Sequence, residues 1–399
     1  MKKIFLTLGI GSLFALPATA QNVGVGTTTP QAKLSVGTNS EFRVDDNGNI
    51  IRINNVPLSF PAAQGGSGQV LTNNGTGTLS WTTPASGAFT VCGDGSAGAL
   101  SVSVGTTLDL TNNASVLSLP SRHNLNFTNI TIAGTLIVPS GTVLKATGTV
   151  TITGTVTVAA GSNASSVPRQ GVAQTAADTY FGGVGLGSLQ AGNIVMAPLQ
   201  AGGSGKAQAS VATVTTGGEG GGGLTIYAKG NIAVTTGASI NANGASGVNP
   251  QSAGVSMVGT GGGAGGIIVL ATKGTLTIGG TIRANGGNGA DGFNGNGGTG
   301  EGGGGGGGGG IVVLMASSSP AITGTLQTIG GAGGANAAAV SPSTTILTAY
   351  GGGACGGNGG NGGGIIPGTT TNANASAGAA GYAITIVLPD IDAYIPGRH

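Results

Sequence analysis

Charged and aromatic side chains are scarce in this chain of 399 residues, at 6% and 4% of the total. Helical bundles and coiled coils need Glu, Lys, Ala and Leu in bulk, so the composition excludes them. The 13 Lys and Arg residues are spread along the chain and form no basic patch, so we expect no nucleic-acid partner. Glycine is abundant instead, at 86 residues, without the Gly-X-Y runs and proline of collagen. A mean hydropathy of +0.28 and many β-branched residues indicate an all-β protein.

Residues 1–20 have the pattern of a secretory signal peptide, with two lysines before a short apolar run and an A-T-A cleavage site at residues 18–20. That run is too short to span a bilayer, and no later run is long enough. We therefore predict an exported protein, extracellular or at the outer-membrane surface, that does not span the membrane. Equal numbers of acidic and basic residues remain after cleavage, so long-range charge does not select its partner.

A repeat predicts the architecture of the middle of the chain. Residues 130–138 read ITIAGTLIV and residues 150–158 read VTITGTVTV, an offset of 20 with five identities in nine positions. Their alternation places apolar residues such as Ile152 on one face and threonines on the other. A fixed period near 20 predicts a solenoid in which stacked coils bury their apolar faces.

The same signature returns later at a longer period. Copies lie at residues 278–282 and 322–326, with similar strand patterns at residues 192–197, 223–228, 266–271, 310–316 and 381–388. Tyr227, Leu270 and Leu314 take equivalent positions in three of these strands, 43 and 44 residues apart. We therefore predict an all-β fold, a parallel β-helix with modules of about 44 residues.

Composition gives the expected boundaries. The segments after the signal peptide are a β-rich segment at 21–85, coils with a period near 20 at 86–181, a glycine-rich β-helix at 182–388 and a tail at 389–399. Within the third segment, residues 286–300 divide into five triplets that begin with glycine, and residues 302–310 are all glycine. A three-residue glycine period suits threefold helices of the polyglycine II type, which pack side by side because no Cβ holds them apart. Flexible linkers are the alternative, but the repeated position between strands favours packed excursions.

Cysteine is rare, with Cys92 and Cys355 as the only two. In an exported chain they are a candidate disulfide. Two buried thiols are the alternative, which we favour because stacked coils would place positions so distant in sequence far apart in space.

Residues 22–36, NVGVGTTTPQAKLSV, resemble the NVGIGTTxPxAKLxV segment of secreted Bacteroidota surface proteins with phage tail-fibre-like sequences, and residues 42–50 and 68–81 resemble further segments of that group. The resemblance implies surface display and a fibre or attachment role, with no catalytic residues. The remainder is similar to glycine-rich β-helical bacterial surface proteins and to phage adhesin tips with packed polyglycine helices. The final residues do not resemble the β-sandwich sorting domain common in such secreted proteins, which implies export with a partner or by another route.

Residues able to carry chemistry are few. Asp291 and Glu301 flank one glycine-rich excursion and are candidates for contact with a cation or a sugar. Phe293 and Tyr350 lie in or beside excursions, where they either stack on a glycan or pin the excursion to the coil. One internal histidine, His123, does not make a Ser/His/Asp arrangement, and no P-loop or zinc spacing is present. We expect no catalytic residues, no cofactor and no metal site.

Two other patterns have ordinary explanations. The pairs Thr131/Thr151 and Thr135/Thr155 form a ladder that would suit an ice-binding face, but only two coils show it and threonine is a favoured exposed strand residue. Lys273, in a Lys-Gly turn, and Asp390 and Asp392, in the tail, are expected to be solvated.

Together these observations predict a non-catalytic surface protein with a structural or adhesive role: a fibre subunit, an adhesin or an accessory of a surface or secretion machine. Its partners would be other surface protein chains, by self-assembly or in an outer-membrane complex, and glycans. The alternatives are a carbohydrate-active or glycan-binding β-helix protein and an ice-binding surface.

Overall fold

The computed structural model describes residues 22–54, 56–82, 91–162, 169–196, 201–207, 217–249 and 255–394. The predicted signal peptide lies outside these residues. The chain divides into two compact units, Met1–Phe89 and Thr90–His399, so the predicted segments 86–181 and 182–388 share one unit for nearly all of their length. Across the described ranges, no helix has the length and apolar character needed to cross a membrane.

The Met1–Phe89 unit consists of short strands with almost no interior. A five-stranded sheet contains β1 (Val23–Val25), β2 (Leu34–Val36), β3 (Phe42–Val44), β4 (Ile50–Ile53) and β5 (Val56–Pro57), and a hairpin contains β6 (Val70–Asn73) and β7 (Leu79–Thr82). Among its described residues only Ser35 and Ser40 are buried. Its large exposed apolar side chains are those of Val23, Val25, Ile51, Ile53, Val56, Phe60, Val70, Leu71 and Trp81. A small sheet is stable only when its apolar face is covered, and the unit itself does not cover this one.

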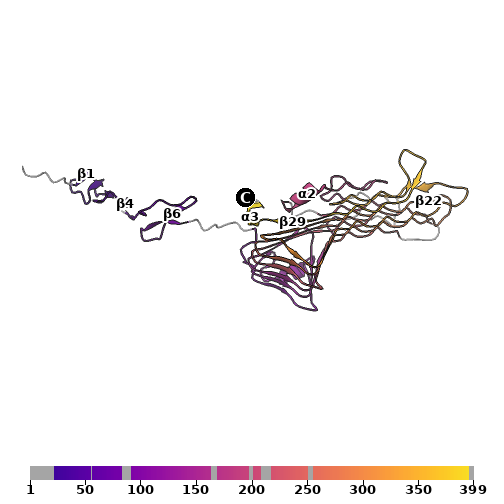
Figure 1. The fold of residues 1–399 in the computed structure, drawn as a ribbon, viewed down its shortest axis with the longest axis horizontal. Helices are drawn as coiled ribbons and strands as arrows, with labels where there is room; N and C mark the ends of the chain where they lie inside the picture. The colour runs from indigo at the N-terminus through magenta and orange to yellow at the C-terminus, as the bar shows by residue number, and fades with distance from the viewer. Residues whose placement is uncertain are drawn as a thin grey trace, which may run out of the picture. The chain divides into compact units, whose positions relative to one another are not determined.

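The Thr90–His399 unit is built on three sheets of six parallel strands (Figure 1). The first sheet contains β8 (Leu100–Val102), β11 (Ile130–Ile132), β14 (Val150–Ile152), β17 (Ile232–Val234), β20 (Leu276–Ile278) and β24 (Ala321–Ile322). The second contains β9 (Thr107–Asp109), β12 (Thr135–Val138), β15 (Thr155–Val158), β18 (Ser239–Asn241), β21 (Thr281–Arg283) and β25 (Thr325–Gln327). The third contains β10 (Asn126–Phe127), β13 (Thr142–Ala146), β16 (Gly223–Ala228), β19 (Ile267–Thr272), β23 (Ile311–Ala316) and β29 (Tyr382–Val387). The chain enters the three sheets in rotation, an order compatible with a β-helix.

The strand register confirms most of the sequence repeat. Ile130 pairs with Val150 at the predicted offset of 20, and Thr281 pairs with Thr325 one long module later. One predicted equivalence is wrong by a residue, because Leu270 pairs with Ile226 rather than with Tyr227. A shift of one residue reverses the face of a strand. Leu270 accordingly belongs to the inner apolar cluster, whereas Tyr227 lies on the outer face of the third sheet.

The predicted strand at residues 192–197 is also wrong. Gly192 is the last residue of α2 (Ser188–Gly192), and the next four residues form η1 (Asn193–Met196), a turn of 3-10 helix, while Ala197 lies outside the described residues. A short apolar run does not distinguish a strand from a buried helical turn by its periodicity. The closing strand predicted at residues 381–388 is confirmed as β29.

Two apolar clusters hold this unit together. The inner cluster lies between the three sheets and includes Ile132, Ile152 and Leu270, each with no exposed surface. The outer cluster covers the other face of the third sheet, so that every residue of β16, β19 and β23 is buried. Sheets buried on both faces have near-continuous apolar strands, which is why these three read GLTIYA, IIVLAT and IVVLMA.

The two ends of the stacked strands differ in how well they are covered. At the first coil, α1 (Asn113–Ser118), capped by Asn112, packs Val116 against the inner cluster, and Val102 is 3% exposed. Ile322 occupies the same column in the last coil and is 40% exposed. Val387 in β29 is exposed too, although its column contains the buried Phe127 and Ala316. The last coil therefore leaves part of the apolar interior uncovered.

Candidate functional site

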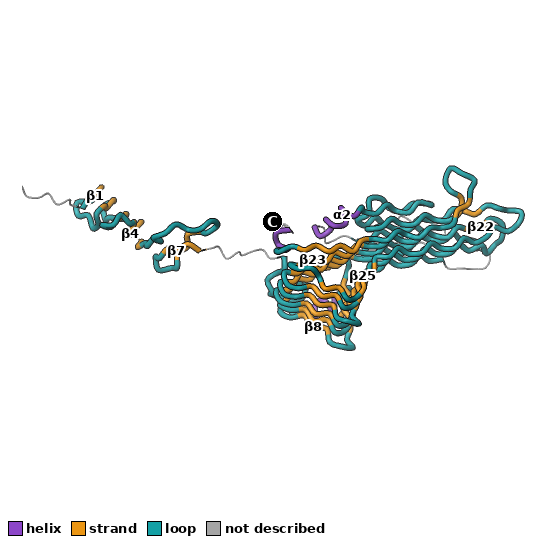
Figure 2. Tube along the Cα trace, in the orientation of Figure 1, coloured by secondary structure: helices purple, strands orange, loops and turns teal. Residues whose placement is uncertain are grey.

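The glycine-rich segments form a bundle of extended chains that runs from the sheets to β22 (Gly300–Glu301) (Figure 2). Residues 302–310 lie at its centre. All nine of their N–H groups donate, to Leu347 O, Asn336 Oδ1, Ala290 O, Tyr350 O, Ser376 O, Gly287 O, Gly353 O, Ala379 O and Ala284 O in order. All nine carbonyls accept, from the N–H groups of Gly259, Gly363, Gly334, Gly262, Gly360, Gly331, Gly265, Gly357 and Tyr382. The distances are 2.7–3.0 Å, so the central segment has no unsatisfied backbone group.

The hydrogen bonds of the central segment follow a period of three. Gly259, Gly262 and Gly265 donate to residues 302, 305 and 308, whose N–H groups donate to residues 347, 350 and 353. Six different segments surround the centre: residues 259–265, 284–290, 331–336, 347–353, 357–363 and 376–382. The neighbour therefore changes from one residue to the next, unlike in a β-sheet, where a strand has only two neighbours.

Close approach of backbones is the reason for glycine at these positions. A Cβ built on any of residues 302–310 would lie 1.9–2.2 Å from a backbone atom of another segment. None of these nine residues has a positive φ, so conformational freedom is not what requires glycine here. The requirement is the space that a side chain would fill.

Asparagine and aspartate side chains bind the backbone at the margin of the bundle. Asn285, Asn288 and Asp291 accept the N–H groups of Ile329, Ala332 and Ala335 at 2.9, 2.9 and 2.6 Å. The candidate residue Asp291 is exposed, and it accepts a backbone N–H in the same way as the two neutral asparagines. Its charge is therefore not needed for that hydrogen bond.

Glu301, the other candidate acid, is in a different environment. Its side chain is buried, with 1% of the residue exposed, and its backbone pairs with Ala337 in both directions. Burial raises the pKa of the Glu301 carboxyl, and the neighbouring Ser256 hydroxyl lowers it by a smaller amount. Phe293 is half-buried and exchanges backbone hydrogen bonds of 2.8 Å with Met257 on an adjacent segment.

Tyr350 belongs to a cluster on another side of the bundle. The Lys206 ammonium lies 5.9 Å from the centre of its ring, pairs with Asp178 and is 2.9 Å from Thr179 Oγ1. Burial raises the pKa of the Tyr350 hydroxyl. The ring of Tyr180 packs edge-on against that of Phe181, a residue that is 54% exposed. Sequence reasoning missed Asp178, Phe181 and Lys206, which precede Tyr350 by more than 140 residues.

The tail is held by charges that were expected to be solvated. Lys273 pairs with Asp390 at 3.1 Å and also with Asp392, whose other carboxylate oxygen accepts the N–H of Val91 at 3.0 Å. Between the two acids, Ile391 is fully buried in the outer cluster at the start of α3 (Ile391–Tyr394). The contact joins the beginning, the middle and the end of this unit.

The candidate disulfide is not formed in the structure. Cys355 is a free thiol, its Sγ faces Gly266 O at 4.0 Å, and burial raises its pKa to about 12. We had expected the two cysteines to lie far apart in space because they are distant in sequence. That reason was wrong, because Cys92 and Cys355 both belong to the outer cluster. The excursions carry distant parts of the chain back over the third sheet, so sequence separation does not measure distance here.

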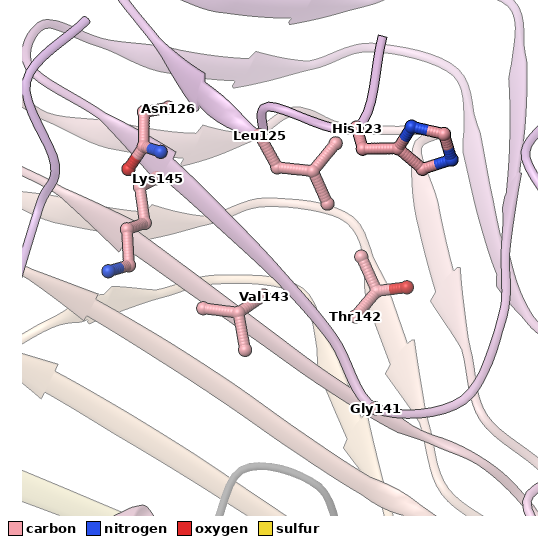
Figure 3. A pocket seen from close by; sticks show the side chains of 7 residues that line it. All are labelled: His123, Leu125, Asn126, Gly141, Thr142, Val143 and Lys145. Carbon is pink, nitrogen blue, oxygen red and sulfur yellow. The ribbon is translucent and has the colours of Figure 1, made fainter. Parts of the chain in front are cut away.

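A shallow depression of about 320 Å³ lies on β10 and β13 (Figure 3). His123 and Lys145 lie at its opposite ends, with Leu125 and Val143 between them. Its lining contains no carboxylate, so it does not present the acid–base pair that polysaccharide cleavage uses. Within the described ranges, three or more His, Cys, Asp or Glu side chains nowhere gather as a metal-binding group.

The threonine ladder is longer than the sequence indicated. Thr107, Thr135, Thr155, Ser239, Thr281 and Thr325 form one column across all six coils of the second sheet. The next outward column contains Asp109, Ile137, Arg283 and Gln327 in place of threonine. This second column contains charged side chains and side chains of different sizes. It therefore does not repeat the regular hydroxyl spacing that a flat ice-binding face would need.

No protein-family model matches the chain, and comparison with curated proteins and with solved structures finds no match.

Replacing Gly306 with alanine tests the packing of the bundle. The new Cβ would lie 2.0 Å from Gly331 O, so we expect a loss of at least about 2 kcal/mol of unfolding free energy. Gly187→Ala is the matched control, because that position has open space and a φ of −73° and should change by less than about 1 kcal/mol. Denaturant unfolding of both variants gives the comparison, and equal stabilities would contradict close packing.

The tail contact predicts a dependence on pH. The Asp392 N–H and the Lys273 ammonium lower the pKa of Asp390 from its ordinary value of 3.8. A lowered folded-state pKa stabilises the fold above the unfolded value, and this contribution is lost as the pH falls through the folded value. Asp390→Asn should therefore lower Tm at pH 7, and its difference from the wild type should shrink as the pH falls below 3.8 and disappear below the lowered folded-state pKa. A difference that stays constant with pH would show that Asp390 does not act through its charge.

Proposed function

We propose that this chain is an exported, non-catalytic subunit of a surface assembly, with a structural or adhesive role. In this proposal its larger unit is a parallel β-helix that bears a bundle of polyglycine II type. The observation that carries the proposal is the apolar surface of residues 22–82, which the unit itself leaves uncovered. The resemblance of residues 22–36 to tail-fibre-like surface proteins supports the same reading.

The occupant of that surface is a second copy of the chain. The nine exposed side chains are aliphatic or aromatic, and every copy carries them at the same concentration. Isolated exposed apolar residues are common on protein surfaces. Here nine lie within about 60 residues, and no apolar side chain of the same described segment is buried, which marks an interaction surface. Association of identical surfaces would also give the short strands the covered face that they lack.

The bundle suits a subunit that must hold its shape outside the cell. Its cohesion comes from hydrogen bonds between residues 302–310, which have no side chains to rearrange, and the six segments around them. Each such bond contributes about 1 kcal/mol net, and the central segment makes seventeen with backbone groups and one with Asn336 Oδ1. The side chains able to recognise a partner lie at the margin and at the β22 end.

Self-association of the mature chain, residues 21–399, tests the proposal. We expect an oligomer by light scattering, which Val25→Lys together with Ile53→Lys converts to monomers because each lysine places a charge in the apolar interface. Val104→Lys, at an exposed apolar position of the larger unit, is the control and should leave the oligomer intact. A monomeric wild-type chain would overturn the proposal. If Val387→Lys dissociates the oligomer and the double variant does not, the interface lies at the uncovered last coil instead.

Binding of a glycan is a second candidate function, favoured by the cluster around Tyr350. The exposed Phe181 ring offers the apolar face on which a sugar ring stacks, and the Asp178–Lys206 pair beside it offers a donor and an acceptor. Gly351 N donates to Asp178 O, so the two segments that carry the cluster are joined by backbone contact.

Phe181→Ala should weaken glycan binding about tenfold, in line with loss of an aromatic anchor. A glycan array probed with the mature chain would identify the ligand, and a titration would give the affinity. Leu189→Ala removes an apolar side chain that is even more exposed than Phe181 but lies outside the cluster, and it should have no effect. Absence of saturable binding across the array would remove this candidate.

A further inference from the structure

The buried carboxylate of Glu301 is the least satisfied polar group in the described part of the chain. Neither of its oxygens is exposed to solvent, and neither has a hydrogen-bond partner among the residues described. One other buried acceptor in the larger unit shares this condition, Asn249 Oδ1. Asn249 donates to Met257 O and Glu301 neighbours Ser256, so both orphaned groups contact the same short segment.

The Ser256 hydroxyl neighbours this carboxylate and is itself close to two amide oxygens. Ser256 Oγ lies 2.6 Å from Asn296 Oδ1 and 3.3 Å from Asn294 Oδ1, and it accepts the N–H of Asn296 at 3.3 Å. Asn294 Nδ2 donates to Ala338 O at 3.0 Å, which leaves its Oδ1 toward Ser256. The cluster thus contains a carboxylate, two amide oxygens and a hydroxyl, and the hydroxyl has one proton to donate.

This cluster has more hydrogen-bond acceptors than donors, so its side chains cannot satisfy one another without a ligand. A buried carboxylate without a partner is strongly destabilising, and the neighbouring amide oxygens offer it no proton. A cation would satisfy the carboxylate and the amide oxygens together. We propose that Glu301, Ser256, Asn294 and Asn296 form a calcium-binding site at the β22 end of the glycine bundle.

Calcium fits this donor set better than other common cations. Ca²⁺ takes six to eight oxygen ligands in flexible geometry, including carboxylates, amide carbonyls and water, whereas Mg²⁺ demands a near-ideal octahedron. Asn296 is exposed whereas Glu301 is buried, so in this proposal the ion reaches the site from the Asn296 side and keeps part of its water. A single carboxylate gives weak binding, with a Kd of about 10⁻⁴–10⁻³ M, the range of extracellular calcium modules.

Equilibrium dialysis of the EDTA-treated mature chain against ⁴⁵Ca²⁺ tests the site. We expect one ion per chain and a rise in Tm that saturates with the same Kd. Glu301→Gln keeps the shape and removes the charge, so it should weaken binding by at least about tenfold and abolish the rise in Tm. Asp291→Asn removes an exposed charge from an adjacent segment, and screening should keep its Kd within about twofold of the wild type.

Two further measurements keep the test decisive. If Glu301→Gln fails to fold, Asn296→Ala at the exposed side of the site should still weaken binding of the folded chain. No binding by the wild type up to about 10 mM Ca²⁺, ten times the weakest expected Kd, would overturn the proposal and leave Glu301 as a buried protonated acid. Equal binding by the wild type and Glu301→Gln would also overturn it, because the ion would then lie elsewhere.

Discussion

The structure of the larger unit depends on how closely one backbone can approach another. In the sheets, strands approach edge to edge and their side chains fill an apolar interior. In the bundle, chains approach from every direction, which leaves no room for a Cβ at residues 302–310. Glycine is poorly suited to an ordered chain because it loses the most entropy on folding. Here that cost is offset by the pairing of every N–H and C=O in the central segment.

The sheets set the register of the bundle. Thr281 pairs with Thr325 in the second sheet, 44 positions later, and Asn285, Asn288 and Asp291 accept N–H groups from residues at the same offset. An apolar strand cannot slip by one residue without turning its interior side outward. The glycine segments have no such pattern of their own, so the strands at the base of each excursion determine which glycine meets which. Loss of the sheets would therefore also remove the order of the bundle.

This division explains what the sequence could predict. Alternating strands carry their own register, so the pairing of Ile130 with Val150 followed from the repeat. The error at Tyr227 arose where a strand is buried on both faces, because apolar residues on each side hide the alternation. Contacts at the margin were missed for another reason. Lys273 pairs with Asp392 across 119 residues, and Glu301 neighbours Ser256, 45 positions earlier. Both contacts depend on how segments distant in sequence come to lie side by side.

The same constraint decides where this protein can carry chemistry. A segment whose every residue must be glycine presents no side chain, so the interior of the bundle has none of the groups that bind or react. Such groups occur where close packing ends, around Tyr350 at one margin and around Glu301 at the β22 end. There the buried Glu301 carboxylate has no hydrogen-bond partner among the described residues. The packing of the bundle satisfies buried hydroxyls such as those of Ser204 and Thr260, but it supplies no donor to this carboxylate, whose partner in our proposal is a calcium ion.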